Sequence, residues 1–112
     1  MTTLSGRKCV PCEGGMAPLP RDEAEKFLQQ LSPEWKLTRN AAAIEREFRF
    51  VDFYRTMSFV NAVAHVANVE DHHPDLEVGY GRCHVLFTTH AARGLSENDF
   101  ICAAKLELIP LT

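Results

Sequence analysis

The stretch IEREFRFVDFYRTMSFVNAVAHVANVEDHHPD, residues 44–75, decides the fold because the spacing of its apolar residues changes partway along. In residues 44–50 apolar and charged side chains alternate, which is typical of a strand with one face in water. Asp52 then suits the N-cap of a long helix. Beyond it, apolar residues three or four positions apart predict the buried stripe of this helix: Phe53, Met57, Val60, Ala64 and Ala67. Pro74 disfavours helical geometry in the residue before it, so the helix ends there.

The segments on either side supply the remaining elements. Upstream, Leu19-Pro20 opens a helix with an apolar face, and residues 35–38 form a short strand; that face comprises Ala24, Phe27, Leu28 and Leu31. Downstream, residues 76–80 and 82–89 predict two strands, followed by a loop. Ser96 and Asp99 resemble a capping box at the start of a last helix, whose apolar face comprises Phe100, Ile101, Ala104 and Leu108.

The order of elements is therefore α-β-β-α-β-β-α. Strands joined as hairpins, with helices gathered on one face, predict an α+β fold. Residues 19–112 form a single domain. Residues 1–18 contain three glycines and two prolines without a clear period, and we expect them to form an irregular arm.

The composition argues against several functional classes. A chain of 112 residues fits one hydrophobic core. The net charge of −3 provides no basic surface, so nucleic acid is not an expected partner. No apolar run approaches the ~20 residues that span a bilayer, so no membrane association is expected. The first five residues lack the apolar region of an export signal, which predicts a cytoplasmic location.

Four cysteines are expected to be thiols rather than a disulfide framework in a reducing compartment. Cys83 and Cys102 lie in apolar stretches and are predicted to be small core residues. Cys9 and Cys12 have the C-x-x-C spacing that also suits zinc or redox chemistry, although no second ligand pair lies in sequence range. Structural thiols, a metal site and a redox pair all remain open interpretations for these two residues.

The histidines are the candidates for proton transfer near neutral pH. His72 and His73 lie at the end of the long helix, and His90 lies at the end of the fourth strand. If the third and fourth strands form a hairpin, these ends are neighbours, so we expect the three imidazoles in one pocket. His65, on the helix, is predicted to be a surface or packing residue, and His84, within a strand, a structural one. A metal site is disfavoured because adjacent histidines seldom chelate one ion.

At this point the residues resemble a known family. The stretches DHHPD (residues 71–75), TH (89–90) and GLSEND (94–99), together with Tyr80, are similar to the signature of the pterin-4a-carbinolamine dehydratases. The resemblance extends from about Leu19 to Leu108. It implies a four-stranded antiparallel sheet with helices packed on one face, in agreement with the order of elements read from the sequence.

The resemblance also implies the chemistry. A 4a-hydroxytetrahydropterin loses water to give quinonoid dihydropterin, with His72 and His90 as acid and base, and with no metal or organic cofactor. His73, with Pro74 and Asn68, would bind the pterin, and Asp99 would orient His90. Asn68 departs from the family, which usually has an acidic residue there, so this position can offer His72 a hydrogen bond but no charge. The implied partners are a reduced pterin and an aromatic amino-acid hydroxylase that supplies it.

Other interpretations stay open. A non-catalytic pterin-binding or dimerisation protein is one, because members of the family also serve as partners of a transcription factor. A small zinc module using Cys9 and Cys12 is another. Whatever the function, we expect a homodimer or homotetramer, because the sheet edges and the last helix offer self-complementary surfaces.

Overall fold

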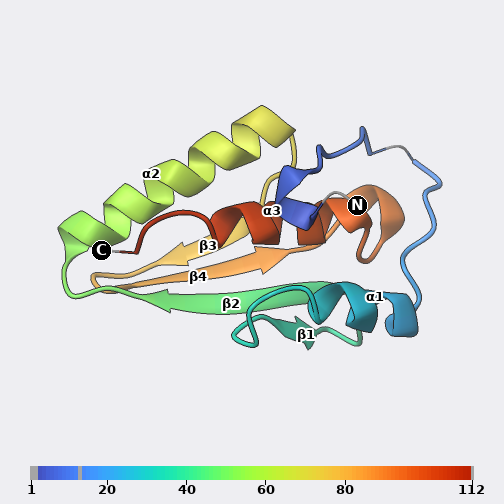
Figure 1. Cartoon of the computed structure of the whole chain (residues 1–112), viewed down its shortest axis with the longest axis horizontal. Coiled ribbons are helices and arrows are strands. Elements are labelled where there is room, and N and C mark those ends of the chain that lie inside the picture. Colours follow the sequence, from blue (N-terminus) through green and yellow to red (C-terminus); the bar gives the residue numbers. More distant parts are fainter. Residues whose placement is uncertain (1–2, 13, 112) are drawn as a thin grey trace.

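The helices and strands of the computed structural model, which describes residues 3–12 and 14–111, follow the predicted order. They are α1 (Arg21–Leu28), β1 (Lys36–Thr38), β2 (Ala43–Arg49), α2 (Phe53–Glu70), β3 (Asp75–Val78), β4 (Arg82–Phe87) and α3 (Glu97–Leu106) (Figure 1). Two short 3-10 helices lie outside this order, η1 (Leu4–Gly6) in the arm and η2 (His90–Ala92) after β4. The segment that begins at His90, expected to be a loop, therefore has regular structure.

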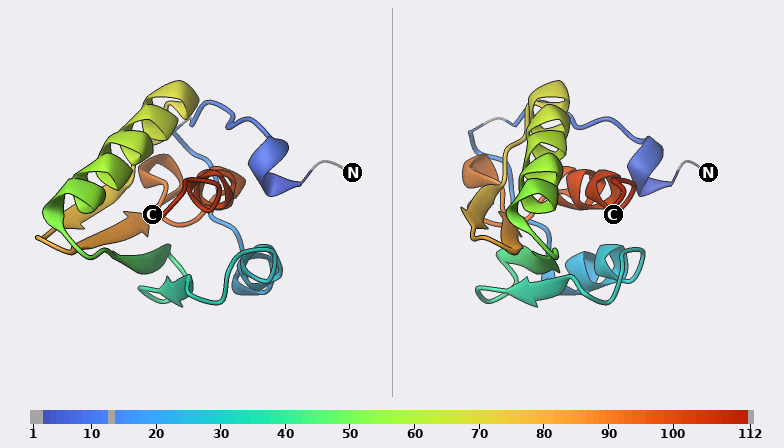
Figure 2. Two further views of the ribbon diagram at one scale, coloured as in Figure 1. Left: turned by 60° about the vertical axis from the view of Figure 1, so that its left-hand side comes forward. Right: turned by 90° about the vertical axis from the view of Figure 1, so that its left-hand side faces the viewer.

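The four strands form one antiparallel sheet in the order β1-β2-β4-β3. The helices gather on one face of this sheet, and α2 runs along it as the longest element (Figures 1 and 2). The predicted α+β architecture is confirmed. In the register of β2 and β4, Phe48 lies opposite Cys83 and Ile44 opposite Phe87, and all four side chains are buried.

Aromatic rings fill the space between the sheet and α2. The ring of Phe59, on α2, lies 4.5 Å from that of Phe48 and 5.2 Å from that of Phe50. Trp35, just before β1, is buried and packs on Phe48 at 6.0 Å and on Phe87 at 6.1 Å. Such pairs add about 0.5–1.5 kcal/mol each to the stabilisation from burial itself. This cluster joins the sheet to its helical layer.

The start of α2 is as expected, but its buried stripe is not. The Asp52 carboxylate accepts a hydrogen bond from the backbone N–H of Arg55 at 2.9 Å, which confirms the N-cap. The stripe is formed by Thr56, Phe59, Val63 and Ala67. The predicted members Phe53 and Ala64 are exposed, Met57 and Val60 are half-buried, and only Ala67 is fully buried.

The error arose because the prediction considered only apolar residues. Thr56 is completely buried, yet its hydroxyl oxygen lies 2.8 Å from the carbonyl oxygens of both Asp52 and Tyr80, which share its one donated proton. A buried hydroxyl with such partners costs little free energy. The helix is therefore turned so that Thr56 and Phe59, rather than Phe53, face the sheet.

The last helix, α3, is surrounded on nearly all sides. Residues 98–104 and Leu106 are buried, whereas Leu108, predicted to lie on the helix, follows its end and is 70% exposed. The arm covers part of α3 (Figure 1): Leu4 of η1 is buried, and the Lys105 ammonium group donates to the Ser5 carbonyl oxygen at 2.9 Å. The prediction that α3 offers a free surface for self-association was therefore wrong.

Replacing Phe59 by Ala should lower the free energy of unfolding by about 3–5 kcal/mol, because it leaves a cavity between α2 and the sheet. The matched variant Phe53→Ala should cost about 1 kcal/mol or less, since Phe53 is exposed and not in the buried stripe. Urea denaturation of both variants measures the difference. Equal losses would mean that the helix is turned the other way.

Candidate functional site

His72 lies where α2 gives way to β3. Asp71, at the C-cap of α2, has a left-handed backbone with a φ of 52°, and the His72 N–H bonds back to the Ala67 carbonyl oxygen at 3.1 Å. This turn directs the His72 side chain inward, and only 7% of the residue is exposed. Its ring stacks on Phe87 at the end of β4, with 6.1 Å between ring centroids and an interplanar angle of 9°. The imidazole is thereby held flat against the end of the sheet.

A buried carboxylate fixes the His72 ring. Its Nε2 atom lies 2.6 Å from Oδ1 of Asp99, a residue with no exposed surface in the first turn of α3. Because a carboxylate accepts hydrogen bonds, Nε2 carries the proton that it donates. In the neutral ring the lone pair is then on Nδ1, so Nδ1 is the atom of His72 that can take up a proton.

The other oxygen of Asp99 is also engaged. Oδ2 accepts hydrogen bonds from the Thr89 hydroxyl group at 2.7 Å and from the Ser96 backbone N–H at 2.9 Å. The Ser96 contact belongs to the predicted capping box, which is confirmed at the start of α3. The positive end of the α3 dipole adds a favourable field for the charge. Asp99 is therefore a rigid acceptor shared by the ends of α2 and β4 and the start of α3.

This arrangement corrects the expected partner of Asp99. The resemblance implied that Asp99 orients His90, but the carboxylate bonds to His72 instead. His90 is exposed at the start of η2. His90 directly follows Thr89, whose hydroxyl group donates to Asp99. The backbone of His90 is therefore adjacent to the same hydrogen-bond cluster.

His73 and Asn68 form a second contact nearby. Nε2 of His73 lies 3.3 Å from Oδ1 of Asn68, one turn earlier on α2, and both residues are exposed. Asn68 was considered as a neighbour of His72, yet it contacts His73. Pro74, the third predicted binding residue, is half-buried at the entry to β3. The exposed His73 ring is thus held by a neutral amide on the solvent side of His72.

The remaining two histidines lie elsewhere. His65 is exposed on α2, as predicted. His84, on β4, pairs with Oε1 of Glu45 across the strands at 2.7 Å, on the sheet face opposite the helices. The pKa of Glu45 is lowered, first by its hydrogen bond with the Thr38 hydroxyl group and then by its hydrogen bond with the His84 side chain. His84 therefore has a structural role, as predicted.

Sequence reasoning missed the contribution of the arm. Sγ of Cys12 lies 3.9 Å from Nδ1 of His72, the nitrogen that Asp99 leaves open. The buried Asn98 side chain fixes this part of the arm: it accepts from the Val10 N–H at 3.0 Å, donates to the Val10 carbonyl oxygen at 2.7 Å and donates to Cys12 Sγ at 3.3 Å. No spacing in the sequence links residues 86 positions apart, so this contact was not predictable.

Glu70, at the last position of α2, also holds the arm. Its carboxylate is 4% exposed and accepts a hydrogen bond from the Cys9 N–H at 2.8 Å. The Lys105 ammonium group lies 3.8 Å away. These contacts, chiefly the Cys9 hydrogen bond, lower the pKa of Glu70 below its ordinary value of 4.5, against the opposing effect of burial.

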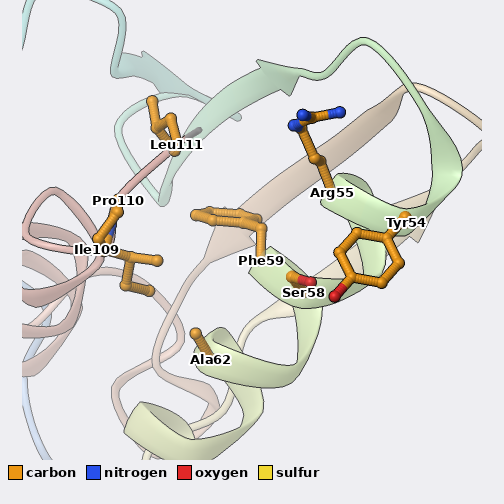
Figure 3. Close-up of a pocket in the computed structure, with 8 residues that line it drawn as sticks. All are labelled: Tyr54, Arg55, Ser58, Phe59, Ala62, Ile109, Pro110 and Leu111. Atoms are coloured by element: carbon orange, nitrogen blue, oxygen red, sulfur yellow. The ribbon is translucent and has the colours of Figure 1, made fainter.

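A cavity of about 460 Å³ lies between α2 and the C-terminal segment (Figure 3). Its lining comprises Tyr54, Arg55, Ser58, Phe59, Ala62, Ile109, Pro110 and Leu111. It opens beside the first half of α2, whereas His72 and His73 follow the other end of this 18-residue helix. The cavity therefore does not belong to the histidine site.

Two further properties bear on function. Within residues 3–12 and 14–111, no cluster of three or more His, Cys, Asp or Glu side chains is arranged to hold a metal ion. No helix in this same part of the chain has the length and apolar character needed to cross a membrane.

Comparisons with known proteins agree with one another. The model of the family described as pterin 4 alpha carbinolamine dehydratase matches residues 17–109. A protein of Nitrosomonas eutropha with the name of a pterin-4-alpha-carbinolamine dehydratase is 58% identical over 106 residues, which are 95% of this chain and 92% of that protein. One from Legionella pneumophila (strain Lens), of the same name, is 53% identical over 104 residues, covering 93% and 92% of the two chains.

The fold is shared with a solved structure. The crystal structure of a transcriptional coactivator/pterin dehydratase from Brucella melitensis superposes with a TM-score of 0.75 at 32% sequence identity. The matched region covers 80% of this chain and 95% of that one.

Glu70→Gln should destabilise the protein by about 1 kcal/mol at neutral pH, because the charge that accepts the Cys9 N–H is lost. A carboxyl whose folded pKa is lowered stabilises the folded chain above its unfolded pKa, and this stabilisation is lost as the pH falls through the folded pKa. The difference from the wild type should therefore vanish well below the ordinary value of 4.5. Urea denaturation at both pH values measures it.

The exposed Glu25 on α1 provides the control, since Glu25→Gln should change stability little at either pH. A constant difference between the Glu70 variant and the wild type at both pH values would contradict the assignment.

Proposed function

Because the chain belongs to the pterin-4a-carbinolamine dehydratase family, we propose that it is a hydro-lyase that removes water from a 4a-hydroxytetrahydropterin. The products are quinonoid dihydropterin and water. The observation that carries the proposal is the buried contact of 2.6 Å between His72 Nε2 and Asp99 Oδ1, which leaves Nδ1 of a fixed imidazole to exchange protons.

The reaction requires an acid and a base. Hydroxide is a poor leaving group, so the hydroxyl group on the bridgehead carbon must be protonated as electrons from a ring nitrogen expel it. A base then collects the proton of the ring. Imidazoles suit both steps, because their pKa lies near the working pH, and such catalysis typically contributes about 10²–10⁴-fold.

We assign the two proton-transfer steps to His72 and His90. His72 acts through Nδ1, and the exposed His90 acts from the start of η2, next to Thr89, whose hydroxyl group bonds to Asp99. In this assignment Asp99 is a positioning residue, which acts through its contact with His72. It sets the proton on Nε2 and stabilises the imidazolium ion when Nδ1 takes up a second proton.

His73 orients the substrate. Its ring is exposed and is held by the Asn68 amide at 3.3 Å, so it presents a fixed polar edge to a flat heterocycle. Pro74 limits the backbone beside it. Asn68 brings no charge to the His73 ring, whereas Asp99 presents a carboxylate to His72.

The protein also self-associates in this proposal, as a homodimer or a homotetramer. Large apolar side chains remain exposed at the start of α2 and at the β3–β4 turn, where Phe53 stacks on Tyr80 at 6.3 Å. Such a patch is typical of an interface. An aromatic amino-acid hydroxylase is the functional partner that supplies the hydroxylated pterin.

A second candidate function is that of a partner protein with an idle site. The name of the Brucella melitensis protein, a transcriptional coactivator/pterin dehydratase, combines both activities. Pterin binding without turnover would favour this candidate over the dehydratase.

The double variant His72→Ala/His90→Ala should lose dehydration, with a rate reduced by at least about 10²-fold, because both proton-transfer groups are gone. The decay of the hydroxypterin's ultraviolet absorbance measures the rate. The matched double variant His65→Ala/His84→Ala should keep its activity, since neither ring belongs to the site. Full activity without His72 and His90 would refute the proposal.

Asp99→Asn should separate the role of His72 from that of His90. An amide has one acceptor oxygen, which the Thr89 hydroxyl group and the Ser96 N–H would occupy. Its NH2 group would then face Nε2 and reverse the His72 tautomer, so we expect turnover to fall about 10²-fold or more. The limb of the pH–rate profile that belongs to His72 should shift, while substrate affinity changes little. A loss of stability with an unchanged pH profile would show that Asp99 serves only the helix cap.

A further inference from the structure

The arm brings Cys9 against a cysteine of the core. Sγ of Cys9 lies 3.5 Å from Sγ of Cys102 on α3, and both are free thiols. We propose that these two residues form a redox-active dithiol site, and that their oxidation to a disulfide ties the arm to α3 beside His72. The sequence pattern suggested Cys12 as the partner of Cys9, whereas the fold supplies Cys102.

The arm is already positioned for this bond. The Cys9 N–H is fixed by Glu70 at 2.8 Å, and both backbone groups of Val10 are bonded to the Asn98 side chain. Glu70 lies on α2 and Asn98 on α3, so two elements of the core hold the residues around Cys9. The thiols therefore meet without any search by the chain, which raises their effective concentration.

The two thiols differ in access. Cys102 is completely buried, and its pKa is raised by the hydrogen bond with Cys9, by burial and by nearby negative charge, so it stays protonated. Cys9 is half-buried, which makes it the sulfur that a dissolved oxidant reaches first. Cys83 is also buried, on β4 opposite Phe48, and burial raises its pKa to about 11. It belongs to the sheet rather than to the contact between the arm and α3, so it serves as the control thiol.

The oxidant is a peroxide. The Cys9 thiol displaces water from hydrogen peroxide and becomes a sulfenic acid. The Cys102 sulfur then attacks the Cys9 sulfur, the S–OH bond breaks, and the thiol proton leaves with the hydroxide as a second water. Each sulfur gives up one electron, and the peroxide takes up both. A dithiol reductant reverses the reaction.

The disulfide would act on the site, an effect that rests on the proposed function. Cys12 Sγ lies 3.9 Å from His72 Nδ1, the atom to which the proposed function assigns proton transfer. The arm therefore has to move before this atom can contact the pterin. In the reduced protein only non-covalent contacts oppose this movement. A Cys9–Cys102 bond would hold the arm over His72, and dehydration should stop.

Peptide mapping under non-reducing conditions tests the bond itself. The reduced protein is treated with hydrogen peroxide, and the expected product is a cross-linked pair of peptides containing residues 9 and 102. Cys12→Ser and the control Cys83→Ala should still form it, and Cys9→Ser should not. A disulfide between Cys9 and Cys12, or oxidation of Cys9 to a sulfinic acid without a cross-link, would overturn the proposal.

Amide hydrogen exchange tests, independently of activity, whether the disulfide holds the arm over His72. Exchange in residues 8–12 should slow at least tenfold in the oxidised wild type and return after treatment with dithiothreitol, and Cys9→Ser should show no change. The dehydration rate should fall and recover with the same treatment. A cross-link that leaves exchange and activity unchanged would overturn the regulatory role, whereas absent activity in the reduced protein would count against the proposed function alone.

Discussion

The buried hydrogen bond between His72 and Asp99 is the interaction on which the arrangement of the site depends. It joins the end of α2 to the first turn of α3, and through Thr89 it includes the end of β4. A buried carboxylate without partners would cost several kcal/mol, so each of these ends must stay where it is. The constraint that fixes the imidazole thus also fixes the meeting point of three elements.

The same constraint explains why Asp99 is able to serve two purposes. One oxygen caps α3 through Ser96, as a helix of any function might require, and the other faces the imidazole. Stability and chemistry therefore share one side chain. The arm also depends on these helix ends, because Asn98 and Glu70 bind it there. They place Cys12 beside Nδ1 of His72, the ring nitrogen that Asp99 does not contact.

Local patterns in the sequence predicted the elements well where one physical effect dominates. The alternation in residues 44–50 and the Asp52 cap gave β2 and the start of α2 correctly. The stripe of α2 was misjudged because Thr56 is buried with its hydroxyl proton shared between two carbonyl oxygens, one of them that of the distant Tyr80. The exposed face of α3 was misjudged because the arm covers it, and no local period reports such a covering.

By itself, the sequence determined the α+β order, the cap at Ser96 and Asp99, and the candidates His72, His73 and His90, since each follows from spacing within a few residues. Only the tertiary structure decided that Asp99 holds His72 rather than His90, and that Cys9 meets Cys102. These partners lie 27 and 93 positions apart. Their pairing depends on how packed elements cross in space, which spacing along the chain does not encode.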